Sequence, residues 1–408
     1  MEQWKEYKIG ELCKISSSKR IFANEYTNSG IPFYRGKEII EKQSGNKIST
    51  ELYISNERFN EIKQKYGVPQ KGDMLLTSVG SLGVPYVVQD ETFYFKDGNL
   101  TWFTDFNNLD SRYLYYWFLS PEGKYNIDNK SIGSTQKALT IDALSKFNIK
   151  LPSLIEQKRI ADFLSSLDDK IELNRQINDN LEQQAQALFK SWFVDNINPN
   201  WEETPLSEVA NLYGGYSYKG DELVDNSDVA MATIKNFDRV GGFKLDGYKP
   251  IIPSSKLKEE HKANLFDILV AHTDLTQNAE VIGNAEPILS FGSFTEIIYS
   301  MDLVKVVPKE NFPYKFLLLA LLKNRFFKAH SLGYVNGTTV LHLSKKALPD
   351  YNVYKPTNEE ADKMNSIFEG IYTKMAQHLG EIEKLSQLRD TLLPRLMSGE
   401  LKINEINC

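Results

Sequence analysis

Two stretches of the chain carry apolar residues at alternating spacings of four and three positions. The first runs from Ile160 to Trp192 and the second from Met364 to Leu396. Eight of the ten positions in each stretch are apolar. Heptad spacing sustained over this length predicts two long helices that form a coiled coil.

Both predicted helices begin with the same capping pattern, a hydroxyl residue followed three positions later by glutamate. The pairs are Ser153 with Glu156 and Thr357 with Glu360. In a capping box each side chain accepts a hydrogen bond from the backbone of the other residue. The predicted stop signals are Pro199 for the first helix and Pro394 with Gly399 for the second.

We expect the two helices to pair in an antiparallel coiled coil. The first ends near residue 196 and the second begins near residue 358, so antiparallel pairing lets the intervening domain close a local loop. In the register that sets Ile160 against Leu396, Asn178 faces His378. A polar pair at mid-helix fixes the register of such a pair. The expected shape is two similar domains at opposite ends of a rod.

The sequence repeats with an offset of 204 positions. The matching residues occur in the same order in both halves, and a chance match of this length is improbable. We therefore expect two domains of one fold, each followed by a long helix. The matched pairs are Gly133 with Gly337, Thr135 with Thr339, Leu139 with Leu343, Asn148 with Asn352, Pro152 with Pro356 and Glu156 with Glu360.

Each repeat alternates short β-prone pieces with turn signals and contains one apolar helix. The predicted fold class is α+β, with two similar mixed α/β domains separated by the two long helices, an internal repeat of pseudo-twofold symmetry. The first repeat has predicted strands at 31–34, 74–77, 86–88, 92–95 and 101–103, with a helix at 111–120, and the second has its helix at 314–327. The predicted boundaries are 1–152 and 199–356 for the domains, 153–198 for the first helix, and 357–408 for the second helix and tail.

Composition and cysteine content narrow the protein class. With 408 residues, 41% of them hydrophobic, the chain can fill two or three cores. No apolar run reaches the roughly 18 residues that span a membrane, and the N-terminus has no signal-peptide pattern. Cys13 and Cys408 lie near opposite ends, which excludes a disulfide framework. We expect a cytoplasmic protein.

The net charge of −6 at first argues against a nucleic-acid partner. Its distribution changes that conclusion. Residues 1–152 hold 20 basic and 18 acidic residues, whereas 201–356 hold 17 and 19, so the two domains together are neutral. The two helical regions, 153–200 and 357–408, each carry −3. We therefore expect weak, salt-sensitive DNA binding by this chain alone.

Motifs for intrinsic catalysis are absent from the sequence. There is no glycine-rich phosphate loop, and the five histidines have no metal-ligand spacing. Asn198, Pro199, Asn200 and Trp201 lack the second proline of the motif with which amino-methyltransferases hold an exocyclic amine. We expect no catalytic, cofactor or metal residue in this chain.

Three segments resemble a known family. The segments 151–171 (LPSLIEQKRIADFLSSLDDKI), 188–193 (LFKSWF) and 392–401 (LLPRLMSGEL) are similar to conserved regions of type I restriction–modification specificity subunits. The resemblance covers essentially the whole chain as two target-recognition domains alternating with two conserved helices. The second helical region, with Pro356, Thr357 and Glu360, is the more divergent.

The resemblance implies a non-catalytic DNA specificity subunit. Each recognition domain would read one half of a bipartite, asymmetric double-stranded DNA target, and the helices would set the spacer between the halves. Two methyltransferase subunits would bring S-adenosylmethionine and methylate adenine. Restriction subunits, which use ATP with Mg, are optional further partners. Trp192, Phe193, Leu393 and Arg395 are the candidate partner-binding residues.

Candidate DNA contacts are loop residues with hydroxyl, amide, imidazole or cationic groups, because these bind phosphates and base edges. In the first domain they are Lys19, Arg20, Arg35, Lys37, Ser78, Ser81, Ser134, Thr135, Gln136 and Lys137. In the second domain they are Tyr216, Tyr218, Lys219, Lys235, Asn236, His272, Thr273, Asn278, Asn336, Thr338 and Thr339.

Two other interpretations of the sequence remain open. The chain could be a coiled-coil scaffold whose twin domains bind proteins rather than DNA. It could also be a solitary methyltransferase or nuclease with an unusual motif. A bipartite methylation motif that depends on this chain would distinguish a DNA specificity subunit from the scaffold and from the solitary enzyme.

Overall fold

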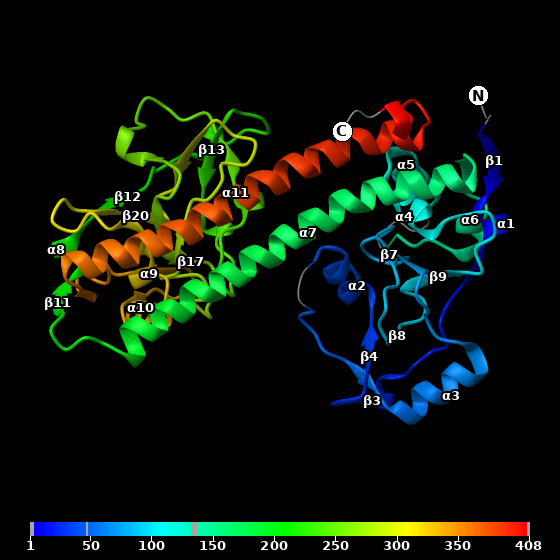
Figure 1. Cartoon of the computed structure of the whole chain (residues 1–408), viewed down its shortest axis with the longest axis horizontal. Helices are drawn as coiled ribbons and strands as arrows, with labels where there is room; N and C mark the ends of the chain where they lie inside the picture. Colours follow the sequence, from blue (N-terminus) through cyan, green and yellow to red (C-terminus); the bar gives the residue numbers. More distant parts are fainter. Residues whose placement is uncertain (1–3, 46–47, 132–136, 406–408) are drawn as a thin grey trace. The chain divides into compact units, whose positions relative to one another are not determined.

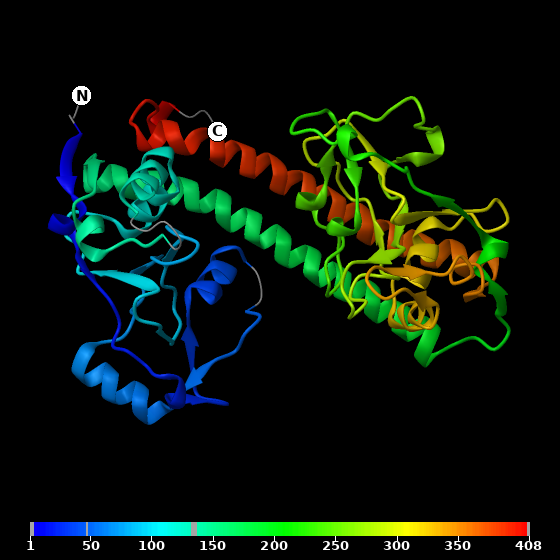
Figure 2. The same cartoon turned by 180° about the vertical axis from the view of Figure 1, so that it is seen from behind.

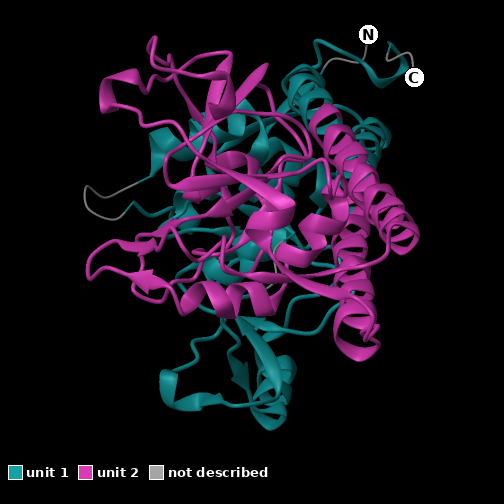
Figure 3. Ribbon diagram, turned by 90° about the vertical axis from the view of Figure 1, so that its left-hand side faces the viewer, with its two compact units in different colours: residues 1–172, 385–408 teal, residues 173–384 magenta. Residues whose placement is uncertain are grey.

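The structure is a computed structural model that describes residues 4–45, 48–131 and 137–405. It forms two compact units, residues 1–172 with 385–408 and residues 173–384 (Figure 3). Each unit combines one globular domain with parts of the long helices α7 (Leu154–Lys190) and α11 (Asn358–Met397). No helix among the described residues is long and apolar enough to cross a membrane.

The first unit is a mixed α/β domain around a four-stranded sheet of order β2-β9-β6-β7. A second sheet has the order β3-β5-β4-β8, and β1 pairs with β10. In both views α4 and α5 lie beside α7, whereas α3 lies on the far side of the domain (Figures 1 and 2). The strands are β1 (Lys5–Lys8), β2 (Lys14–Ser16), β3 (Tyr26–Thr27), β4 (Ile31–Tyr34), β5 (Tyr53–Ile54), β6 (Met74–Thr77), β7 (Pro85–Val87), β8 (Tyr94–Phe95), β9 (Leu100–Thr104) and β10 (Asn148–Leu151). The helices before α7 are α1 (Ile9–Leu12), α2 (Gly36–Gln43), α3 (Asn56–Tyr66), α4 (Ser111–Leu119), α5 (Pro121–Lys130) and α6 (Ile141–Ser145).

The second unit has the same sheet plan. Its central sheet has the order β12-β20-β16-β18, a second sheet has the order β14-β13-β19-β15, and β11 pairs with β23. A further small sheet has the order β17-β22-β21. The strands are β11 (Glu202–Pro205), β12 (Ala210–Gly214), β13 (Val229–Ala232), β14 (Lys249–Pro250), β15 (Lys262–Ala263), β16 (Ile268–Ala271), β17 (Thr273–Asp274), β18 (Ala285–Pro287), β19 (Glu296–Tyr299), β20 (Leu303–Pro308), β21 (Val335–Asn336), β22 (Leu341–Leu343) and β23 (Asn352–Lys355). The helices between α7 and α11 are α8 (Leu206–Val209), α9 (Lys315–Leu322) and α10 (Arg325–Leu332).

The sequence repeat is therefore a structural repeat. The central sheets match strand for strand, and each second sheet contains one parallel pair, β4 with β8 and β13 with β19. Strand β23 begins 204 positions after β10, at the predicted offset. The predicted α+β class is confirmed.

The long helices pack against each other in an antiparallel direction within the second unit. Asn178 contacts His378 and Met375, while Trp192, in the helical turn that follows α7, contacts Phe368, which lies earlier on α11. This is the predicted register. Its polar pair adjoins Met375, which belongs to the apolar core of the second unit.

The predicted capping box is complete at the start of α11, and its serine bond is present at the start of α7. The Thr357 hydroxyl accepts a hydrogen bond from Glu360 N at 3.4 Å, and the Glu360 carboxylate accepts one from Thr357 N at 3.1 Å. At the start of α7 the Ser153 hydroxyl accepts from Glu156 N at 3.4 Å. Pro394 does not end α11, which continues to Met397 before Gly399 adopts a positive φ of 74°.

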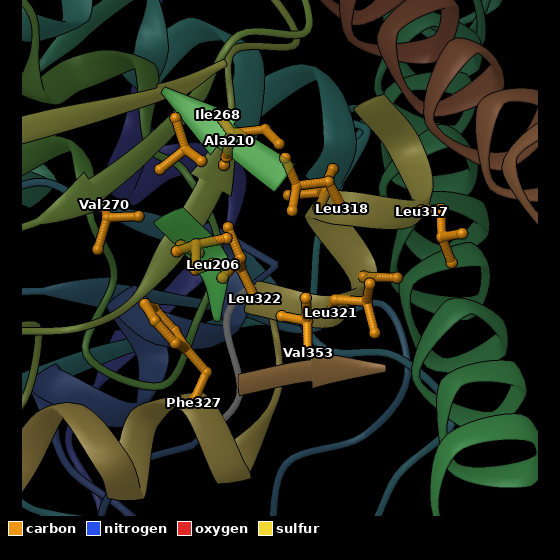
Figure 4. Packing of buried hydrophobic residues seen from close by; sticks show 14 of the residues in the cluster. Leu206, Ala210, Ile268, Val270, Leu317, Leu318, Leu321, Leu322, Phe327 and Val353 are labelled. Carbon is orange, nitrogen blue, oxygen red and sulfur yellow. The ribbon is translucent and has the colours of Figure 1, made fainter. Parts of the chain in front are cut away.

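The apolar helix predicted at 314–327 is wrong as a single element, because it is two helices. The Asn324 side chain accepts hydrogen bonds from Phe326 N and Phe327 N and so caps the start of α10. Two residues separate the end of α9 from the start of α10. Both helices bury apolar residues against the central sheet and α11 (Figure 4). The labelled core residues are Leu206, Ala210, Ile268, Val270, Leu317, Leu318, Leu321, Leu322, Phe327 and Val353.

Candidate nucleic-acid interface

The predicted DNA-contacting loops lie at one edge of each central sheet, the edge formed by the ends of its strands. In the first unit Thr77, at the end of β6, pairs with Leu100, at the start of β9, and Ser16 at the end of β2 pairs with Trp102. The ends of β2 and β6 and the starts of β7 and β9 therefore lie at one edge. The loops that follow β2 and β6 both leave the sheet there.

Three backbone hydrogen bonds join these loops in the first domain. Ser78 N donates to Asn99 O at 2.8 Å, and Leu139 N donates to Ser78 O at 2.9 Å. Lys96 N donates to Tyr34 O at 2.8 Å, which brings the segment after β4 to the same edge. We name this set of segments, residues 17–20, 35–37, 78–84, 96–99 and 137–139, the first loop cluster.

The second domain repeats these three hydrogen bonds with different residues. His272 N donates to Asp302 O at 2.8 Å, and Leu343 N donates to His272 O at 2.8 Å. Ser300 N donates to Ala232 O at 2.9 Å. The second loop cluster consists of residues 215–219, 233–236, 272–284, 300–302 and 336–342. One backbone frame thus carries unlike side chains in the two domains.

Five candidates of the first domain are exposed at its loop cluster. The Arg20 side chain is 65% exposed and donates from Nε to Asp97 Oδ2 at 2.8 Å. The Lys19 ammonium lies 5.2 Å from the centre of the Tyr66 ring. The exposed candidates are Lys19, Arg20, Lys37, Ser81 and Lys137.

Arg35 is engaged within the protein, against expectation. Its guanidinium donates to both carboxylate oxygens of Glu38, at 3.2 and 2.6 Å, and the Glu38 side chain is fully buried. Burial raises the pKa of Glu38, but the hydrogen bonds from Arg35 outweigh it and lower the pKa overall. Arg35 therefore compensates a buried charge, and because its side chain is still 33% exposed its assignment as a DNA contact stays a prediction.

Four hydroxyl or amide candidates are corrected because they are buried and hydrogen-bonded inside their domains. The Ser78 hydroxyl contacts the Thr101 hydroxyl at 2.5 Å. The Asn236 amide donates to Lys244 O at 2.7 Å, and its oxygen accepts from Thr233 N. Side chains that complete such internal bonds cannot also reach a base edge. The Tyr216 hydroxyl donates to Glu222 and contacts the Ser254 hydroxyl, and the Thr273 hydroxyl donates to Asp302 Oδ1 at 3.0 Å. The corrected residues are Ser78, Tyr216, Asn236 and Thr273.

The remaining second-domain candidates are accessible. Tyr218 and His272 are half-buried, and the exposed ones are Lys219, Lys235, Asn278, Asn336, Thr338 and Thr339. Ser134, Thr135 and Gln136 lie outside the described residues.

The surroundings of His272 favour its neutral form. Burial lowers the pKa of His272, and the neighbouring His342 and Lys345 lower it further. A neutral imidazole can donate one hydrogen bond and accept another, as base readout requires.

His342 is exposed beside His272 and was missed by sequence reasoning. It occupies the position that Ala138 occupies in the first domain, since Ala138 bridges Val79 and His342 pairs with Thr273. The 204-residue offset links these two positions and could have identified it.

Two of the four partner-binding candidates are core residues. Phe193 stacks on Phe189 at a centroid distance of 5.5 Å, and Leu393 is buried in the core of the first unit. Trp192 remains half-buried against Phe368, and Arg395 is exposed with its Nε 2.9 Å from Glu400 Oε1. Phe193 and Leu393 are therefore corrected.

No group of three or more His, Cys, Asp or Glu side chains in the described part of the chain is arranged to hold a metal ion. Cys13 is buried, and burial raises the pKa of its thiol to about 12.

Known proteins are similar to this chain in sequence and in fold. Residues 1–183 match the family described as the type I restriction modification DNA specificity domain. The MjaIX specificity subunit of Methanocaldococcus jannaschii is 24% identical over 431 residues, which cover 99% of this chain and 95% of that subunit. Residues 1–183 thus match the DNA specificity domain of type I restriction–modification systems, and the chain is similar to a specificity subunit along nearly its whole length.

A second relative of this chain is the HindI specificity subunit of Haemophilus influenzae. It is 25% identical over 477 residues, covering 98% of this chain and all of the relative. The crystal structure of a type I S subunit from M. genitalium has the same fold, with a TM-score of 0.59 at 17% identity, over 97% of this chain and 96% of that one.

Proposed function

We propose that this specificity subunit reads a bipartite, asymmetric DNA sequence, with one loop cluster for each half. The observation that carries the proposal is the shared backbone frame with unlike side chains. Ser78 in the first cluster corresponds to His272 in the second, and Ala138 corresponds to His342. Two domains with the same backbone arrangement would approach DNA in the same orientation. Their different side chains would then select different bases.

The DNA contacts in this proposal are of two kinds. Exposed lysines such as Lys37, Lys137 and Lys235 bind phosphates, which gives affinity but no sequence preference. Polar side chains of the clusters, such as the half-buried His272 and the exposed Asn278, read base edges. The two domains together carry no net charge, so tight binding needs cationic surface from partners.

The partners in this proposal are two methyltransferase subunits that bind S-adenosylmethionine and methylate adenine. The long helices hold these subunits and set the spacer between the half-sites. Restriction subunits that use ATP and Mg are a further possible component of the complex. The specificity subunit itself is non-catalytic and holds no cofactor.

Sequencing the methylome of a host that carries this gene with its methyltransferase gene tests the proposal. We expect one bipartite N6-methyladenine motif that disappears when the specificity gene is deleted. A motif that persists after deletion would show that specificity resides elsewhere. An absence of any motif in the wild-type complex would favour the protein scaffold.

A further inference from the structure

The loop that follows β6 in the first loop cluster is much shorter than the loop that follows β16 in the second. The loop from β6 to β7 covers residues 78–84, and the loop from β16 to β18 covers 272–284, six residues more. Both loops close with the same bond, from Gly83 N to Thr77 O at 2.8 Å and from Gly283 N to Ala271 O at 2.7 Å. The additional residues therefore lie inside the second loop and leave its base unchanged.

Asp274 organises this longer loop from within. Its carboxylate, buried to 2% exposure, accepts hydrogen bonds from Thr276 N, Val281 N and the Thr276 hydroxyl, each at 2.8 Å. Burial raises the pKa of Asp274, but these hydrogen bonds outweigh it and lower the pKa overall. The two ends of the 275–280 segment are thereby held to one carboxylate.

Lys328 of α10 holds the same loop from the other side. Its ammonium donates to the carbonyls of Ala279, Glu280 and Ile282 at 3.1, 3.0 and 2.5 Å. The Glu280 carboxylate in turn lies 3.1 Å from Arg239 Nε. The loop backbone is therefore fixed before any ligand binds, which reduces the ordering cost of binding.

The tip of the loop is open to solvent. The Leu275 side chain is 64% exposed, and Gln277 and Asn278 are exposed beside it. The Gln277 amide donates to Thr338 O at 2.5 Å, which joins the tip to the 336–342 segment of the cluster. Asn278 makes no hydrogen bond to another described residue, so its amide is available to a ligand.

We propose that the 275–280 segment distinguishes the second half-site from the first, with Asn278 contacting a base edge and Asp274 and Lys328 acting as positioning residues. An asparagine amide offers the donor and acceptor pair that matches adenine in the major groove. A rigid backbone makes this contact selective, because a misplaced base leaves the amide unpaired. The proposal rests on the proposed function above.

The experiment uses the full subunit assembled with its methyltransferase subunits and a library of DNA duplexes of random sequence. Methylated duplexes are sequenced, and the preference at every base pair is compared between variants. We expect Asn278→Ala to reduce discrimination about tenfold at one base pair of the second half-site. Lys328→Met should reduce discrimination at that same base pair, and Lys328→Arg, which keeps the charge and the donors, should restore it.

Two matched controls separate positioning from general folding. Asn226→Ala removes an exposed amide of the same domain outside the loop cluster. Lys309→Met removes a lysine that donates to a carbonyl, that of Ser207, at the far end of β20. Both should leave the base preferences unchanged.

The inference is overturned if Asn278→Ala and Lys328→Met complexes keep the wild-type preferences. If Lys328→Met fails to assemble, the exposed Asn278→Ala variant decides. A wild-type complex without a bipartite motif would instead refute the proposed function, so the two failures are distinguishable.

Discussion

Asn178 Oδ1 lies 2.8 Å from His378 Nδ1, between the two long helices of the second unit. The amide of the same asparagine donates to Met375 O at 3.2 Å. Both side chains are at most 9% exposed. A buried polar pair at this position favours the native register, because any shift would leave both groups without these partners.

Asn178→Leu should destabilise the subunit, since His378 would lose this hydrogen-bond partner while remaining buried. We expect a loss of about 1–3 kcal/mol in the free energy of unfolding, measured by denaturant titration. The double variant Asn178→Leu with His378→Leu should recover most of that loss. Additive losses in the double variant would show that the pair does not interact as described.

Arg35→Ala should affect stability more than DNA binding. The substitution leaves the buried Glu38 carboxylate without its compensating charge, which costs about 3–5 kcal/mol. Lys37→Ala, at a neighbouring exposed side chain, should leave stability unchanged and reduce the salt dependence of DNA binding by about one unit of slope. If Arg35→Ala weakened DNA binding and left stability unchanged, Arg35 would be a DNA contact.

The Arg35–Glu38 pair also predicts how acid acts on the fold. The pKa of Glu38 is lowered in the folded state, so its contribution is complete above the ordinary value of 4.5 and is lost as the pH falls through the folded value. Unfolding free energies measured from about pH 6 to pH 3 should therefore fall more steeply for the wild type than for Arg35→Ala. Parallel curves would contradict the pairing.

Lys323 compensates two carboxylates in the second unit. It forms ion pairs with Glu286, which is 3% exposed, and with Glu182 of α7 at 3.3 Å. Burial raises the pKa of Glu286, and Lys323 opposes that rise.

Lys323→Met should cost about 3–5 kcal/mol near neutral pH, because it leaves buried charge unpaired. The pKa of Glu286 would rise further, so the variant should be more stable at about pH 5 than at about pH 8, the direction expected when the folded state binds the extra proton. Circular dichroism during thermal unfolding at the two pH values measures this. Equal losses at both would show that Glu286 is not the group left uncompensated.

The long helices and their register could be predicted from the sequence because heptad spacing reports directly on packing. The register that sets Ile160 against Leu396 brings Asn178 to His378, and the structure shows this contact. The break between α9 and α10 was not predicted, although Lys323, Asn324 and Arg325 interrupt the apolar run and asparagine is a favoured N-cap residue. It depends on Asn324, whose side chain caps the second helix.

The candidate site could be predicted by segment but not by side chain. The loops of both clusters were identified from residue types next to strand ends. Whether a polar loop residue faces water or completes an internal hydrogen bond depends on the tertiary structure, as the buried Ser78 and Asn236 show. His342 was not predicted because β22 pairs it with Thr273, beside His272. With three residues, β22 is too short to be recognised in the sequence.

The central claim is that each loop cluster reads one half of the target. The most direct measurement is the methylated motif of the complex that carries His272→Ala and His342→Ala, compared with that of the wild type. We predict that the bases of the second half-site become less specified while the first half-site is unchanged. A motif altered in both halves, or altered in neither, would contradict the account.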